Sequence, residues 1–150
     1  MFRVEILWLV ILATTSIYII YSDVRYRRIS NLSVCFVTFS TIPLFLTYGS
    51  ILSVGSAIGI ILIGVLLNFF SLLGAGDTKV LAAFALVITP EFMLPTILLV
   101  LVLGGIMAAG YLVYMLLTGN SKIRKRGIPY GVPICIGGIL GVLASSLSIQ

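Results

Sequence analysis

The sequence contains no histidine and very few acids. Its four acidic residues are Glu5, Asp23, Asp77 and Glu91. Without histidine, hydrolysis by a Ser-His or Cys-His arrangement and zinc binding by an HExxH motif are excluded. Acid–base chemistry, if the chain performs any, must therefore come from carboxylates.

Cysteine is also scarce. The two cysteines, Cys35 and Cys135, lie in apolar stretches without a CxxC spacing. This pattern indicates small core residues and not a disulfide or metal framework. Two acids alone would form a poor metal cage, so we expect neither a metal ion nor another cofactor.

Charged residues are scarce as well. Charged residues make up 9% of the chain, hydrophobic residues 61%, and the mean hydropathy is +1.28. A soluble domain carries about 25% charged residues, so the composition predicts an all-α, polytopic membrane protein. We expect residues 1–150 to form one transmembrane domain. The net charge of +5 comes from basic residues clustered in short loops, which is typical of topology signals and not of nucleic-acid binding.

Six apolar segments are candidates for membrane crossing, since a transmembrane helix needs about 20 mostly apolar residues. The predicted helices are Val4–Tyr21, Leu32–Tyr48, Ile51–Leu73, Thr78–Leu94, Pro95–Leu117 and Pro129–Ser148. The fourth is the weakest, because it is short and carries Pro90 and Glu91 near its far end. A re-entrant half-helix is the alternative there.

The basic residues predict the orientation of these helices. They follow the first, third and fifth predicted helices and are Arg25, Arg27, Arg28, Lys79, Lys122, Arg124, Lys125 and Arg126. By the positive-inside rule these three loops face the cytoplasm and both termini lie outside it, as in a multi-pass protein of the inner membrane. The same count puts Asp23 and Asp77 together at the cytoplasmic boundary. We interpret Arg25, Arg27 and Arg28 as topology and lipid-headgroup anchors.

Asp77 closes the segment Gly74-Ala75-Gly76-Asp77 between two apolar runs. An acid near a membrane core is costly unless it is paired, solvated or protonated, so it indicates a functional site. Two neighbouring carboxylates share a proton, one acting as a base and the other as an acid. Because Asp77 would begin the fourth helix, we expect it to be the more easily ionised member. Gly74 and Gly76 would permit a positive φ or a close backbone approach.

Glycines also predict where helices pack. Gly55–Gly59 and Gly137–Gly141 have the GxxxG spacing. This spacing lets two helix backbones approach closely in lipid. We therefore expect both pairs to line helix–helix contacts.

Three segments resemble the motifs of a known family. Segment 23–31 reads Asp-Val-Arg-Tyr-Arg-Arg-Ile-Ser-Asn, segment 74–79 reads Gly-Ala-Gly-Asp-Thr-Lys, and segment 128–133 reads Ile-Pro-Tyr-Gly-Val-Pro. In this order they resemble the first aspartate block, the GxGD-x-K block and the Pro-Tyr-Gly segment of the type IV prepilin peptidases, membrane aspartic proteases of the GxGD class. The likeness is greatest to the small Tad/Cpa-type members that process Flp pilins.

The resemblance implies an endopeptidase that removes a basic leader from an apolar pilin helix, cutting after a glycine at the cytoplasmic face. Asp23 and Asp77 carry over as the catalytic pair. Further residues match motif positions: Gly74, Gly76, Lys79, Asn31, Pro129 and Tyr130. We expect Pro129 to start the last helix, where its missing N–H costs nothing. The implied partners are a prepilin, membrane lipid and the pilus assembly machinery.

Two departures from the family pattern and two rival functions remain. Ser30 replaces the usual proline of the first block, and the CxxC-containing domain of larger bifunctional members is absent. The sequence shows no glycine-rich cofactor loop, so methylation of the pilin has no support. A small proton-coupled transporter would use the acids as a proton relay, but would need them at mid-membrane depth. A non-enzymatic subunit of a pilus or secretion apparatus would tolerate Asp23→Asn and Asp77→Asn together.

Overall fold

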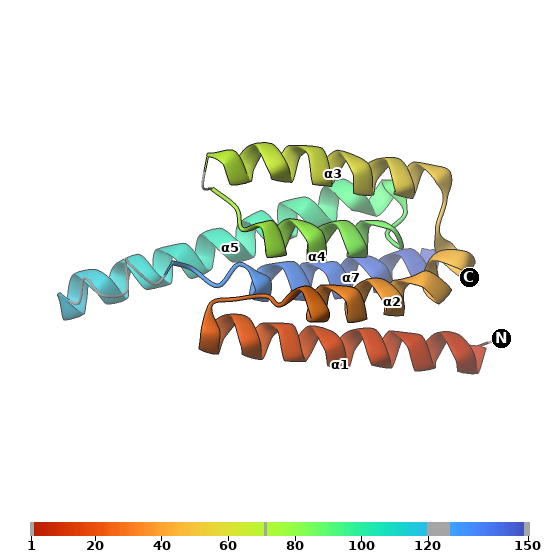
Figure 1. Cartoon of the computed structure of the whole chain (residues 1–150), viewed down its shortest axis with the longest axis horizontal. Coiled ribbons are helices and arrows are strands. Elements are labelled where there is room, and N and C mark those ends of the chain that lie inside the picture. The colour runs from red at the N-terminus through yellow and green to blue at the C-terminus, as the bar shows by residue number, and fades with distance from the viewer. Residues whose placement is uncertain (1, 71, 120–126, 149–150) are drawn as a thin grey trace.

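The computed structural model describes residues 2–70, 72–119 and 127–148, and in these ranges every regular element is a helix. The helices are α1 (Phe2–Tyr26), α2 (Asn31–Tyr48), α3 (Ile51–Phe69), α4 (Ala75–Ala85), α5 (Pro90–Thr118) and α7 (Gly131–Ser148) (Figure 1). All but α4, that is five helices, are long and apolar enough to cross a bilayer. The chain is therefore an all-helical, multi-pass membrane protein, as the composition predicted.

The helices lie side by side, and their connections alternate between two ends of the bundle (Figure 1). The start of α1, the end of α7 and the α2–α3 connection lie at one end. The α1–α2 and α3–α4 connections lie at the other. The end of α1 and the start of α4, which carry Asp23 and Asp77, therefore meet at the same end of the bundle.

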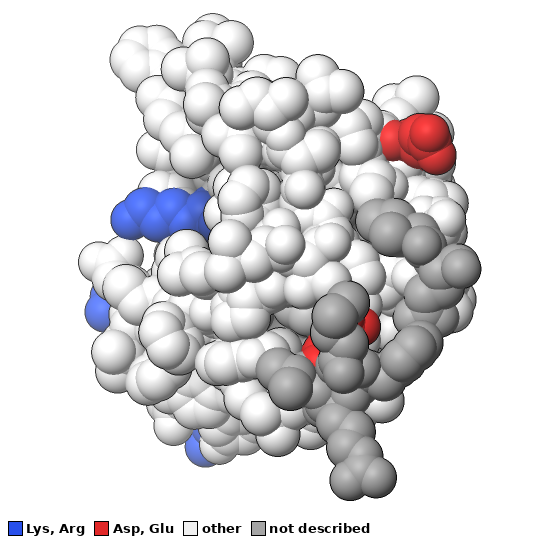
Figure 2. Space-filling view, turned by 90° about the vertical axis from the view of Figure 1, so that its right-hand side faces the viewer, with Lys and Arg blue, Asp and Glu red and all other residues white. Residues whose placement is uncertain are grey.

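Charge is sparse over the end where α1 begins and α7 ends. Figure 2 looks onto this end, and most of the visible atoms belong to neither acidic nor basic residues. Lys and Arg atoms are visible only along the left-hand margin of the view. The face on view thus shows few basic and few acidic side chains.

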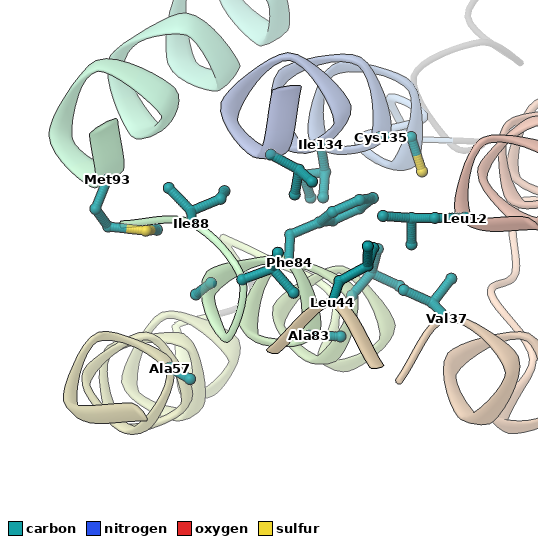
Figure 3. Close-up of a cluster of buried hydrophobic side chains, with 14 of the residues drawn as sticks. Leu12, Val37, Leu44, Ala57, Ala83, Phe84, Ile88, Met93, Ile134 and Cys135 are labelled. Atoms are coloured by element: carbon teal, nitrogen blue, oxygen red, sulfur yellow. The ribbon is translucent and has the colours of Figure 1, made fainter. Parts of the chain in front are cut away.

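Helix α4 is too short to cross a bilayer, and its neighbours enclose it. It packs against α2, α3 and α7. Its Phe84 side chain is fully buried and lies between Leu12 of α1, Leu44 of α2 and Ile134 of α7 (Figure 3). Because protein and not lipid surrounds α4, a helix of 11 residues can end inside the bundle.

The backbone N–H and C=O groups that follow the C-terminal end of α4 find hydrogen-bond partners within the protein. The Phe84 carbonyl accepts from the N–H groups of Val87 at 3.0 Å and Ile88 at 3.2 Å. The hydroxyl of Ser53 in α3 donates to the Ile88 carbonyl at 3.0 Å, and the Thr89 N–H donates to the hydroxyl of Ser145 in α7 at 3.0 Å. Non-helical backbone at membrane depth is tolerated when protein groups pair it in this way.

The predicted junction between the fourth and fifth helices is wrong. The sequence prediction ended one helix at Leu94 and began the next at Pro95, whereas α4 ends at Ala85 and α5 begins at Pro90. Thr89 is extended, as the residue before a proline tends to be, and Pro90 occupies the first helical position, where its missing N–H costs nothing. Pro95 instead lies inside α5.

Only one of the two predicted glycine pairs lines a helix contact. A Cβ on Gly137 would meet Val100 of α5, and one on Gly141 would meet the Thr96 side chain at the same interface. A Cβ on Gly55 or Gly59 would have no described atom within 4 Å. The GxxxG prediction is therefore confirmed for α7 and wrong for α3.

Gly138 allows a matched test of the packing around α4. A Cβ there would lie 2.5 Å from Cγ and Cδ2 of the buried Phe84 ring. We expect Gly138→Ala to lower the thermal unfolding temperature of the chain in detergent, because the ring has no space into which to move. The control Gly55→Ala, in open space on α3, should leave it unchanged or raise it, since alanine is about 0.5–1 kcal/mol better than glycine in a helix. Equal unfolding temperatures for Gly138→Ala and Gly55→Ala would contradict the packing of Gly138 against Phe84.

Candidate active site at the end of the bundle

Asp23 lies in the last two turns of α1 and is 7% exposed. Helix α1 continues to Tyr26, beyond the predicted end at Tyr21, so this acid is part of the helix and does not follow it. Its Oδ2 atom accepts a hydrogen bond of 2.7 Å from the N–H of Gly131, the first residue of α7. The N-terminus of a helix favours a carboxylate, because its free N–H groups and dipole are positive.

Gly131 allows this contact sterically. A Cβ at Gly131 would lie 2.7 Å from Oδ2 of Asp23, which is too close for any side chain. Gly131 belongs to the motif segment 128–133, but the motif alone predicted no role for it. The close approach of a carboxylate to a helix start is the physical reason for glycine at this position.

Asp77 lies in the first turn of α4, as predicted. Burial raises the pKa of the Asp77 carboxyl to about 6; the negative charge of Asp23 acts in the same direction, and a hydrogen bond from the Gly74 backbone opposes both. The expectation that the helix N-terminus makes Asp77 easy to ionise is therefore wrong. Desolvation exceeds the effect of the helix end, and Asp77 holds its proton to a higher pH than an exposed aspartate.

Both acids line the same two cavities, of about 560 and 530 Å³. Asn31 and Gly76 line the first cavity, Tyr130 lines the second, and Gly74 lines both. Cavities of this size are typical of ligand sites, which span about 300–1,000 Å³. Six of the eight predicted site residues thus border one composite cavity between α1, α4 and the start of α7.

The other two predicted residues lie outside the cavity walls. Lys79 is exposed, and its Nζ donates to Oδ1 of Asn31 at 3.1 Å, which ties α4 to the start of α2. Pro129 is buried but does not start the last helix, which begins at Gly131. The Pro129 carbonyl accepts from the N–H of Val132 at 3.3 Å, so this proline precedes the helix and caps its first turn.

The glycines of the GxGD segment have a steric role and not a left-handed backbone. Gly74 has φ −71° and Gly76 lies within α4; the positive-φ glycines among the described residues are Gly119 and Gly127. A Cβ on Gly74 would lie 2.7 Å from Oδ2 of Asp77. A Cβ on Gly76 would lie 3.0 Å from Cβ of Ile29, in the α1–α2 connection. The positive-φ prediction is wrong, and close approach is the reason for both glycines.

Arg27 is a site residue that the sequence prediction missed. Arg25 and Arg28 are exposed, as headgroup anchors would be, but Arg27 is half-buried and lines both cavities beside the two acids. Its Nη2 donates to the hydroxyl of Tyr111 in α5 at 2.9 Å. Three arginines within four residues give no sequence signal that one of them faces inward.

Comparison with known proteins identifies one family. A model of the type IV leader peptidase family matches residues 10–109. The match spans Asp23, Asn31 and the segment 74–79, and it ends before Tyr111 and the Pro129–Tyr130 segment. No curated protein and no solved structure is significantly similar to the chain.

The raised pKa of Asp77 predicts how stability depends on pH. The folded chain keeps a proton that the unfolded chain releases above the ordinary pKa of 3.8, so wild-type stability should fall as the pH rises from about 4 through 6. Asp77→Asn mimics the protonated acid. We expect this variant to unfold at a higher temperature than wild type at pH 7.5, and the difference to vanish near pH 3.5. Unfolding in detergent across this range measures the effect.

Glu91→Gln is the matched control, because Glu91 is exposed at the start of α5. Its unfolding temperature should differ little from that of wild type at both pH values. A wild type and an Asp77→Asn variant that unfold together at pH 7.5 would contradict a partly buried Asp77 with a raised pKa.

Proposed function

Since this chain belongs to the type IV leader peptidase family, we propose that its peptidase activity is that of an aspartic endopeptidase using Asp23 and Asp77. The family's substrates are prepilins, which carry a leader peptide ahead of an apolar helix. The observation that carries the proposal is that two acids from separate helices line the same cavities at one end of a membrane bundle. Among the described residues, no group of three or more acids or cysteines that could hold a metal accompanies them.

The surroundings of the two acids favour different roles for them. Asp23 accepts the Gly131 N–H at the start of α7, which favours its carboxylate form. Asp77 has a raised pKa and keeps its proton more readily than an exposed acid. We assign Asp23 as the base that takes a proton from the attacking water. Asp77 is the acid that donates a proton to the peptide carbonyl oxygen.

The hydrolysis then balances without a cofactor. The water oxygen bonds to the scissile carbonyl carbon while its proton passes to Asp23. At the same time Asp77 gives its proton to the carbonyl oxygen. Collapse of the intermediate then breaks the carbon–nitrogen bond: a hydroxyl of the intermediate returns a proton to Asp77, and the leaving amine takes the proton held by Asp23. The leader gains a carboxyl group, the pilin gains an amino group, and the two acids return to sharing one proton.

The position of the acids suits a substrate that is half in the membrane. Asp23 and Asp77 lie at the end of the bundle reached by the α1–α2 and α3–α4 connections. We propose that this end faces the cytoplasm from the inner membrane, with both termini on the other side. A basic leader would then remain in the aqueous cavity and near the lipid headgroups, while the apolar pilin helix remains in lipid. A proton relay through the membrane is disfavoured, because the acids lie at an end of the bundle and not at its middle.

We further propose the narrower assignment given by the resemblance of the three motif segments. The chain would be a small Tad/Cpa-type enzyme, one transmembrane domain over residues 1–150, that cuts Flp-like prepilins after a glycine and supplies the mature subunits to pilus assembly. Asn31, Lys79 and Tyr130 would support the site without taking part in proton transfer. The hydrogen bond from Lys79 to Asn31 supports this reading, since it holds the first cavity's wall.

The two acids can be tested by isosteric substitution. Asp23→Asn and Asp77→Asn should each reduce cleavage of a co-expressed Flp-type prepilin by more than about a hundredfold, the low end for a general acid–base group. The measurement is the size shift on leader removal, with membrane abundance of each variant as a reference. Glu91→Gln should cleave at the wild-type rate. Near-normal processing by either aspartate variant would exclude the pair.

The close contact of the GxGD segment gives a second test. Gly76→Ala should reduce cleavage and Gly76→Val should reduce it further, because a Cβ at this position meets Ile29 in the connection that borders the acids. Ala75→Gly, a change at the exposed neighbouring position, is the control and should be mild. A fully active Gly76→Val would leave the contact without functional meaning.

A further inference from the structure

Arg27 has an unusual backbone conformation. It follows the last residue of α1 and has φ +56°, the one positive φ of a non-glycine residue in the part of the chain that the structure describes. Its N–H donates to the Asp23 carbonyl at 2.9 Å. A left-handed residue that closes a helix with such a bond is usually glycine, because a Cβ is strained there. An arginine at this position indicates that its side chain has a use.

The guanidinium of Arg27 is held from α5. Its Nη2 donates to the Tyr111 hydroxyl at 2.9 Å, and its central carbon lies 5.3 Å from the centre of the Tyr111 ring. The two contacts fix the plane and the position of the group. They also hold its positive charge beside cavities that Asp23 and Asp77 line.

The other terminal nitrogen of Arg27 has no hydrogen-bond partner among the described residues. This atom, Nη1, is buried. Leaving a buried charged donor without an acceptor is costly. A guanidinium can only donate, so the missing partner must be an acceptor oxygen. A peptide segment bound in these cavities supplies such oxygens from its backbone carbonyls.

We propose that Arg27 is a substrate-positioning residue whose Nη1 donates to a backbone carbonyl oxygen of the peptide segment bound between Asp23 and Asp77. The inference rests on the proposed endopeptidase function and adds a residue to it. Arg27 keeps its proton throughout and forms no covalent bond. Tyr111 orients the guanidinium and does not touch the peptide.

The test compares purified wild type, Arg27→Gln, Arg27→Gly, Tyr111→Phe and Arg25→Gln on a synthetic prepilin segment. A hydrogen bond to a charged group contributes enough that its loss should raise KM by about tenfold to a hundredfold in both Arg27 variants, with a smaller change in kcat. Tyr111→Phe keeps the ring but removes the hydroxyl, and should raise KM by a smaller factor. Arg25→Gln removes the same charge from an exposed position near Arg27 and should match wild type.

Arg27→Gly separates the side chain from the backbone. Glycine adopts φ +56° without strain, which offsets the loss of the Tyr111 contacts, so this variant should fold and remain measurable if Arg27→Gln does not fold. Wild-type KM in Arg27→Gly would overturn the proposal, because only the backbone turn would then matter. Equal KM values for Arg27→Gln and Arg25→Gln would overturn it as well.

The pH profile distinguishes positioning of the peptide from tuning of the acids. Because the Arg27 charge also acts on Asp23, an altered midpoint alone decides nothing; if Arg27 acts on the substrate, the rise in KM in Arg27→Gly should persist at every pH of the profile. A loss confined to kcat with a shifted acidic midpoint would show that Arg27 acts only through the carboxyls, and would overturn the proposal. A wild type that does not cleave any prepilin would instead contradict the endopeptidase function itself.

Discussion

The hydrogen bond between Gly131 and Asp23 joins two helices that are far apart in the sequence. It brings the N-terminus of α7 against the last turns of α1, 108 residues apart in the chain. The contact needs a residue without a Cβ on one helix and a nearly buried carboxylate on the other. The Gly131 N–H offsets part of the cost of burying that charge, and burial remains the larger effect. Burial of Asp77 and, after it, the negative charge of Asp23 raise the pKa of Asp77 to about 6.

Helix α4 brings the second acid to this site because it is enclosed and short. Its apolar residues pack on α2, α3 and α7, and serines from α3 and α7 pair the backbone that follows it. The position of its first turn is therefore fixed by the core around Phe84 and not by lipid. Without a Cβ, Gly74 leaves room for the carboxylate of Asp77. Gly76 likewise lets the first turn of α4 lie close to Ile29 in the α1–α2 connection. Packing and hydrogen bonds from neighbouring helices thus position both acids, as acid–base catalysis requires.

The sequence was sufficient for the class of fold and for the meeting of the two acids. Long apolar runs predicted the membrane helices, and the basic loops put Asp23 and Asp77 at one end of the bundle, where the structure has them. Periodicity could not locate the end of α4, because Leu86 to Ile88 are as apolar as the helix itself and only the serine partners fix the break. It could not separate Arg27 from Arg25 and Arg28 either, since a backbone turn and a tyrosine 84 residues away decide which arginine faces inward. The basic segment at 122–126 lies outside the described residues.

The central claim is that Asp23 and Asp77 act as one catalytic unit. The most direct test is the cleavage rate of a prepilin segment by the purified Asp23→Asn/Asp77→Asn double variant, compared with both single variants by mass spectrometry of the released leader. Residues that act as a unit are non-additive, so the account predicts that the double variant is no slower than the slower single variant. Losses that multiply, so that the double variant is slower by the product of the two single effects, would show two independent contributions and contradict the account.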